Sequence, residues 1–364
     1  MKLLIITQKI DKNDDILGFF HRWVQEFAKH CEKVTVICLQ KGEYDLSDNV
    51  KVLSLGKEKN TLINPGVIPR ILLKLKYAFN FYKYIWQERK NYDAVFAHMN
   101  PEYIVLGGFF WKLFGKKTSL WYTHRQVNLK LKIAEKLVDN IFTASKESFQ
   151  LKSKKVGFLG HGIDIKQYKC EKRTKTENKS SENLKIKILH VGRITPIKNC
   201  DILIKTAKIL KDKWNKDFHI QFLGSPVTLK DKQYFKLLKK MTVSMGLSDE
   251  IDFLGSVPNN KIKEFYCSAD FAVNLAPTGG VDKVVLESMA SKTLVFASNL
   301  AFFDYFGQYS KDLMFKERDS EDLTEKIMRL EKSKNKDSIK DFLFTKINNT
   351  ASLNKLVKNI LSKI

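Results

Sequence analysis

Two cations and a glycine follow a strand-like run in the second half of the chain. Residues 190–199 read HVGRITPIKN and place Gly192 and Arg193 directly after a β-branched run, with Lys198 before a helix-like stretch. A glycine permits a tight turn, and the amino terminus of a following helix favours an anion. Arg193 and Lys198 add two cationic groups that could converge on one diphosphate. The segment predicts phosphate binding; the alternative is two solvated surface cations.

A second loop of the same kind lies at residues 277–287, PTGGVDKVVLE. The paired glycines Gly279 and Gly280 expose backbone N–H groups to which a hydroxyl or phosphate oxygen can bond. Glu287 falls in the first turns of the next helix-like stretch, where its carboxylate can reach a ligand above the helix amino terminus. The loop predicts a ligand contact; the alternative is an ordinary turn with a surface glutamate.

Short β-branched runs, alternating with stretches of helical period, must position these loops. The runs lie at residues 3–7, 34–38, 50–55, 94–97, 118–122, 141–144 and 156–159, then at 186–191, 219–223, 251–254, 271–275 and 294–297. Apolar strands separated by helices indicate a mostly parallel sheet covered on both faces. In such sheets ligands bind at the carboxyl ends of the strands.

The alternation stops once, at residues 166–184, which are polar and charged and predict a linker. An α/β architecture with two doubly wound domains follows, the first over residues 1–165 and the second over residues 185–341. Apolar positions at roughly helical spacing predict a terminal helix over residues 342–364.

The 364 residues carry a formal net charge of +24, which favours polyanionic partners: nucleic acid, an anionic membrane or phosphorylated substrates. Residues 51–155 hold 20 basic and 7 acidic residues. Residues 69–90 and 109–117 mix basic with aromatic side chains, as an interfacial membrane helix does. They predict peripheral contact with an anionic membrane; the alternative is an amphipathic helix with its aromatic side in the core.

No run approaches the roughly 20 apolar residues of a spanning helix. The first residues predict a buried strand rather than a signal peptide. The five cysteines are scattered and fit no metal or disulfide spacing: Cys31, Cys38, Cys170, Cys200 and Cys267. A cytoplasmic, reducing location is expected, with binding at the inner membrane face.

Nucleic acid is the least supported partner, because no helix-turn-helix, zinc or aromatic RNP pattern occurs.

The second half of the chain resembles the donor-binding domain of glycosyltransferase family 4, retaining enzymes of the GT-B fold. The matching stretches read VGRITPIKNCDILIKTAKIL, FLGSVPNNKIKEFYCSADFAVNLAP and GGVDKVVLESMASKTLVFASN. The resemblance implies two Rossmann-like domains facing a central cleft, the first binding the acceptor and the second a nucleotide-sugar donor.

In that resemblance Arg193 and Lys198, beside Gly192, hold the donor diphosphate. Glu287 matches the second glutamate of the family's Glu-x7-Glu pattern, which usually contacts the ribose hydroxyls. The residues expected beside the nucleotide base are Ser256, Val257 and Pro258.

One departure concerns the first acidic position of Glu-x7-Glu, which is Gly279 here. In the family that carboxylate binds hydroxyls of the donor sugar. Asp282 is the nearest substitute, and Gly280 and Val281 complete a loop expected to contact the donor.

The first half resembles the family in the stretches WYTHRQ, VDNIFTASKES and FLGHGIDIKQY. His124 matches a histidine that faces the transferred sugar; on position alone, at the end of a buried strand, a core histidine is the favoured alternative. Gly18 matches the glycine of the N-terminal loop near the diphosphate, although the family's double glycine is missing.

The resemblance implies transfer of a hexose, with retention, from a nucleotide-diphosphate sugar to a lipid-linked or cell-surface glycan. Arg193 and Lys198 would stabilise the departing diphosphate, and His124 would hold the sugar. No Asp-x-Asp occurs in a suitable loop, so neither a metal nor another cofactor is expected. The alternatives are a nucleotide-sugar epimerase of the same fold, a sugar-nucleotide-binding protein without turnover and a basic nucleic-acid-binding protein.

Overall fold

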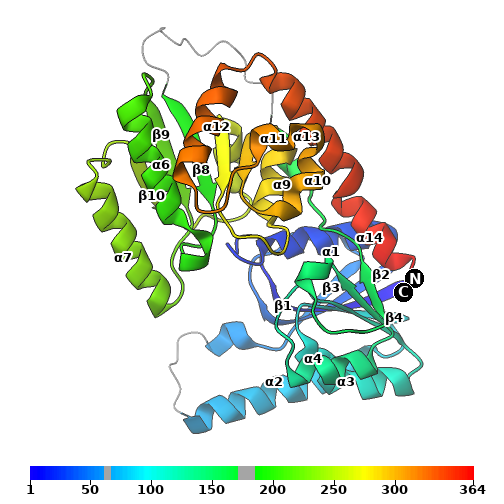
Figure 1. Ribbon diagram of the computed structural model, residues 1–364. Helices are drawn as coiled ribbons and strands as arrows, with labels where there is room; N and C mark the ends of the chain where they lie inside the picture. The colour runs from blue at the N-terminus through cyan, green and yellow to red at the C-terminus, as the bar shows by residue number, and fades with distance from the viewer. Residues whose placement is uncertain (61–66, 171–184) are drawn as a thin grey trace. The chain divides into compact units, whose positions relative to one another are not determined.

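The computed structural model describes residues 1–60, 67–170 and 185–364 (Figure 1). The chain forms two compact units. The first comprises Met1–Gly162, Pro258–Asn260 and Leu353–Ile364, and the second Ile163–Val257 and Lys261–Ser352. Each unit contains one parallel sheet, and each of the twelve strand-like runs predicted from the sequence overlaps a strand.

The first unit contains a seven-stranded sheet in the order β3-β2-β1-β4-β5-β6-β7. Its strands are β1 (Lys2–Ile10), β2 (Lys33–Lys41), β3 (Val50–Ser54), β4 (Ala94–His98), β5 (Lys117–Trp121), β6 (Asn140–Thr143) and β7 (Val156–Phe158). The central strand β4 is buried at all five positions, because helices cover both faces of the sheet.

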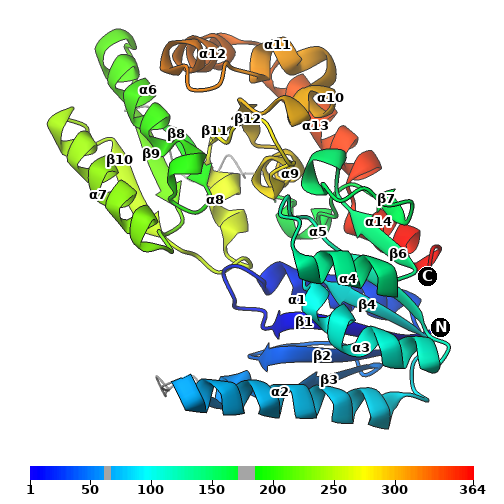
Figure 2. The same ribbon diagram turned by 60° about the horizontal axis from the view of Figure 1, so that its bottom comes forward.

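Two groups of helices cover this sheet (Figure 2). One core contains side chains of α1 (Gly18–His30) and α14 (Leu353–Leu361). The other contains side chains of α2 (Val67–Glu88), α3 (Pro101–Leu113) and α4 (Leu129–Leu137). The unit is therefore doubly wound, as predicted.

The second unit contains a five-stranded sheet in the order β10-β9-β8-β11-β12. Its strands are β8 (Ile186–Val191), β9 (Phe218–Leu223), β10 (Ile251–Gly255), β11 (Phe271–Asn274) and β12 (Leu294–Ala297). Its main helices are α6 (Cys200–Lys213), α7 (Leu229–Ser244), α8 (Ile262–Ser268), α9 (Lys283–Ala290), α12 (Ser320–Lys332) and α13 (Lys336–Thr350). The strand order reverses between β8 and β11, which is where doubly wound sheets bind ligands.

The prediction of a single terminal helix over residues 342–364 is wrong. The chain forms α13 and α14, which belong to different units. The turn between them is stabilised by the N–H of Ile163, which donates to the carbonyl of Ala351 at 2.8 Å. Asn354 on α14 donates to Glu26 of α1 at 2.6 Å. These tertiary contacts end one helix and start the next, although the apolar spacing continues.

The unit boundary falls between residues 162 and 163, three residues before the predicted one. A short helix, α5 (Ile165–Tyr168), occupies the start of the predicted linker. The rest of that linker, residues 171–184, lies outside the described residues.

The expectation that no cysteines pair is also corrected. Cys170, just after α5, forms a disulfide with Cys267 in α8. The two lie 97 positions apart, so only the fold of the second unit brings them together. The other three cysteines are buried and free.

Candidate functional site

The loop after β8 is fixed against the loop after β9. The N–H of Gly192 donates to the carbonyl of Leu223 at 2.9 Å, and the N–H of Ile194 to that of Ser225 at 3.3 Å. Gly224 permits this contact, because a Cβ there would lie 2.0 Å from the Gly192 carbonyl oxygen. The tight packing gives the segment leading to Lys198 a defined position at the end of β8.

Arg193 is exposed in this loop, next to the buried Ile194. Its guanidinium makes no hydrogen bond or ion pair with any residue that the structure describes. An exposed guanidinium beside a rigid glycine turn is available to an incoming anion.

Lys198 and Asp282 come from the two predicted loops and meet in an ion pair. The Lys198 Nζ lies 2.6 Å from Asp282 Oδ2, and the side chains are 20% and 28% exposed. Asp282 is the residue before the first turn of α9. The structure thus brings the proposed diphosphate ligand and the proposed substitute carboxylate together at the carboxyl ends of β8 and β11.

Asn274, at the end of β11, was missed by the sequence reasoning. Its Nδ2 donates to Asp282 Oδ2 at 2.9 Å, and the side chain is 2% exposed. Its Oδ1 is buried without a hydrogen-bond partner among the described residues. A polar residue ending an otherwise apolar strand at the switch point was the available signal.

The loop with the paired glycines is held by a buried asparagine. Asn299 Oδ1 accepts from the N–H of Gly279 at 3.3 Å, and its Nδ2 donates to the carbonyl of Gly280 at 2.9 Å. The N–H of Gly279 is therefore already used within the protein. Val281, half-buried, follows these glycines and leads into Asp282.

Glu287 is buried, so the alternative of an ordinary surface glutamate is wrong. The hydroxyl of Tyr266 donates to Glu287 Oε2 at 3.0 Å. Burial and the nearby Glu287 charge raise the pKa of Tyr266 well above its usual value, so the phenol stays a donor. Burial lowers the pKa of Lys283 to about 8, with the Glu287 charge acting in the opposite direction.

The residues predicted beside the base divide between the units. Ser256 and Val257 follow β10 in the second unit, whereas Pro258 groups with the first. Gly18 also belongs to the first unit and begins α1, where a Cβ would lie 3.2 Å from the carbonyl oxygen of Lys12.

His124 lies in the first unit, in the loop after β5. It is exposed, with its ring centroid 6.2 Å from that of Tyr122. The alternative of a buried core histidine is therefore wrong, and a role toward the sugar stays a prediction.

Comparison with known protein families gives a match over most of the second unit. Residues 171–340 match the family model of glycosyl transferases group 1. The resemblance expected from the sequence is confirmed at the level of this glycosyl transferases group 1 model, and the fold is of the GT-B type.

Individual relatives are distant. The capsular polysaccharide biosynthesis glycosyltransferase CapH of Staphylococcus aureus is 25% identical over 178 residues, 49% of this chain and 46% of that protein. The O-antigen chain mannosyltransferase RfbU of Salmonella typhimurium is 24% identical over 180 residues, 48% and 46% of the two chains. The chain therefore spans less than half the length of these curated relatives.

Among solved structures, Anabaena HepE in complex with UDP aligns with 100% of this chain and 99% of its own, at a TM-score of 0.73 and 14% identity. The glycosyltransferase from Rickettsia africae ESF-5 aligns with 99% of this chain and 97% of its own, at a TM-score of 0.72 and 14% identity. At this identity the likeness shows the fold.

Proposed function

We propose that the protein is a retaining glycosyltransferase that moves a hexose from a nucleotide-diphosphate sugar to a lipid-linked or cell-surface glycan. The observation that carries the proposal is the meeting of Lys198 and Asp282 at the switch point, with the exposed Arg193 five residues before Lys198 in the same loop. Cations placed there suit a diphosphate leaving group.

The chemistry follows from charge. As the bond between sugar and diphosphate loosens, negative charge grows on the leaving phosphate, and Arg193 and Lys198 stabilise it. The leaving phosphate oxygen accepts the acceptor's proton, so no protein nucleophile is needed. Asp282 replaces the missing carboxylate at position 279, and Glu287 binds the ribose hydroxyls. His124 holds the sugar.

The relatives support a nucleotide donor and a glycan product. HepE has been crystallised with UDP-glucose, and RfbU is named a mannosyltransferase. CapH is named for capsular polysaccharide biosynthesis. These names favour a hexose and a surface polysaccharide for this chain.

The acceptor is proposed to arrive at an anionic membrane, and the exposed face of α2 supports this. Five large apolar side chains on this helix are 54–68% exposed: Ile71, Leu72, Leu75, Phe79 and Trp86. They recur at helical spacing, while Phe81 and Ile85 are buried in the core. The alternative that the aromatic side is simply core thus holds for only part of the helix.

Charge selects the partner of this apolar face. Lys74, Lys76 and Lys83 are exposed on the same helix, and Phe109 and Leu113 on α3 add apolar area at 67% and 68% exposed. Basic side chains beside apolar ones repel a second copy and attract anionic lipid. No helix in the described ranges is long and apolar enough to cross a bilayer. We place the protein peripherally on the cytoplasmic face.

Gly279 supports a second candidate, a sugar-nucleotide-binding protein without turnover. The position has no side chain, and its N–H is engaged by Asn299. If Asp282 does not replace the carboxylate, the donor binds but is not transferred.

One experiment tests these functions. Thermal shifts over UDP-, GDP- and ADP-sugars identify the donor, and nucleotide release is then measured with lipid extract. The proposal expects acceptor-dependent release of the nucleoside diphosphate with an α-linked product from an α-linked donor. Binding without release supports the second candidate, and a new sugar isomer without release indicates an epimerase. No binding of any nucleotide sugar contradicts all three.

A further inference from the structure

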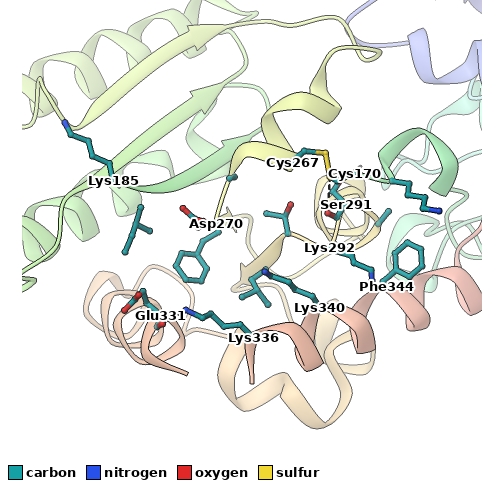
Figure 3. Close-up of a pocket in the computed structure, with 17 residues that line it drawn as sticks. Cys170, Lys185, Cys267, Asp270, Ser291, Lys292, Glu331, Lys336, Lys340 and Phe344 are labelled. Carbon is teal, nitrogen blue, oxygen red and sulfur yellow. Dashed lines mark hydrogen bonds between the residues drawn. A yellow bond between two sulfur atoms is a disulfide. The ribbon is translucent and has the colours of Figure 1, made fainter. Parts of the chain in front are cut away.

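The disulfide joins the segment after α5 to α8, the helix whose Tyr266 is hydrogen-bonded to Glu287. Cys170 follows α5, and Cys267 lies near the end of α8. Both cysteines are half-buried and line a cavity of about 820 Å³ in the second unit (Figure 3). The disulfide is therefore reachable by a small reductant.

Tyr266, directly before Cys267, connects the disulfide to Glu287. Its side chain is 1% exposed, and its hydroxyl donates to Glu287 Oε2 at 3.0 Å. Tyr168, two residues before Cys170, packs edge-on against the Tyr266 ring, with 6.0 Å between centroids. The disulfide thus joins the two short segments that carry these two tyrosines.

The end of α9 completes the connection. Cys170 Sγ lies 3.3 Å from the carbonyl oxygen of Ser291, and the Ser291 hydroxyl donates to the Glu287 carbonyl at 3.0 Å. Thr293 donates to the carbonyl of Tyr266 at 2.7 Å. The disulfide therefore contacts the backbone at the end of α9, where Ser291 is hydrogen-bonded to the backbone of Glu287.

We propose that Tyr266 is a positioning residue for Glu287, and that the Cys170–Cys267 disulfide holds it, so that reduction weakens binding of the nucleotide. The inference rests on the proposed role of Glu287 toward the ribose. Tyr266 does not touch the donor; it fixes the orientation of the carboxylate that does.

The redox step needs a dithiol reductant. One reductant thiolate attacks a sulfur of the disulfide and forms a mixed disulfide, and the second displaces the remaining cysteine. Cys170 and Cys267 become thiols, and the reductant is oxidised to its disulfide. The freed Cys170 thiol has an acceptor in the Ser291 carbonyl.

Accessible disulfides are the labile ones, and those in a reducing compartment are usually regulatory. With a cytoplasmic location, the cysteine pair would make the affinity for the nucleotide depend on the redox state of the cell. The oxidised enzyme is the tight-binding form.

The test compares nucleotide affinity in the two redox states. The probe is whichever of UDP, GDP and ADP gives the largest thermal shift, titrated calorimetrically against protein treated with oxidised glutathione or with dithiothreitol. Free thiols are counted under denaturing conditions: the oxidised protein should have three and the reduced protein five. We expect about tenfold weaker binding after reduction, the effect of loosening one hydrogen bond to a charged group.

Variants separate positioning from folding. Tyr266→Phe retains the ring and is expected to raise the donor KM about tenfold with kcat within twofold. Tyr234→Phe, which removes a hydroxyl 2.8 Å from Asp201, is the matched control and leaves KM unchanged. The double variant Cys170→Ser/Cys267→Ser is expected to bind weakly in both conditions, whereas Cys31→Ser responds like the wild type.

Equal affinity in the two redox states, or five thiols after oxidation, overturns the inference. The inference is also overturned if Tyr266→Phe and Tyr234→Phe change kcat and the donor KM to the same extent. Absence of nucleotide binding in both redox states contradicts the proposed function instead, so the two failures are distinguishable.

Discussion

The ion pair between Lys198 and Asp282 gives opposite predictions for binding and for transfer. Asp282→Asn keeps the shape of the side chain and an oxygen that can accept from Asn274. It removes a negative charge that lies 2.6 Å from Lys198 Nζ, where we expect the diphosphate. Nucleoside diphosphate should therefore bind more tightly, while transfer should slow, because the sugar loses its carboxylate partner.

The magnitude follows from the exposure of the pair. Both side chains are less than one third exposed, so the interaction exceeds that of a surface pair but is reduced by solvent. An effect of about 1.4 kcal/mol corresponds to tenfold tighter binding. We expect kcat to fall by about 100-fold, the loss typical of one charge that acts mainly in the transition state.

Isothermal titration with the nucleoside diphosphate and single-turnover transfer measure the two effects. Asp304→Asn is the matched control, because Asp304 is exposed in the same unit and the charge change is identical. Unchanged or weaker binding in Asp282→Asn refutes the reasoning. Equal tightening in both variants would assign the effect to net charge alone.

Three further predictions concern metal, pH and membrane. Transfer should persist in EDTA, and activity that requires added Mg²⁺ or Mn²⁺ would contradict metal independence. Burial lowers the pKa of His190 to about 4, so the folded protein keeps this histidine neutral while the unfolded chain takes up a proton below about pH 6.5. The free energy of unfolding should therefore fall by about 3 kcal/mol from pH 6.5 to 4, and denaturant titrations of His190→Asn should show a smaller fall. Phe79→Ser/Trp86→Ser should reduce co-sedimentation with anionic vesicles at least tenfold, against an unchanged Leu229→Ser control, which is 80% exposed on α7. Binding indifferent to anionic lipid and to salt contradicts the membrane proposal.

The strands and the two candidate binding loops were predictable because their signals are local. Strands buried on both faces leave continuous apolar runs, and the segments around Arg193 and Glu287 follow such runs directly. Parallel topology then requires that the ends of β8 and β11 share one edge of the sheet.

The contacts that the sequence did not predict join residues far apart in the chain. Tyr266 and Glu287 are 21 residues apart, and Cys170 and Cys267 are 97 apart. Spacing in the sequence carries no record of such contacts, because they arise only when α8 and α9 pack in the second unit. The break after Ala351 has the same origin, since a carbonyl contact with Ile163 ends a helix whose periodicity continues.

The central claim is that Arg193 stabilises a departing diphosphate, and turnover of Arg193→Ala with the identified donor tests it most directly. Arg329→Ala, which removes an exposed guanidinium paired with Asp312 in the same unit, is the control. We predict that kcat falls by about 100- to 1,000-fold in Arg193→Ala, with unchanged thermal stability, and remains near wild type in Arg329→Ala. Wild-type turnover in Arg193→Ala would contradict the account.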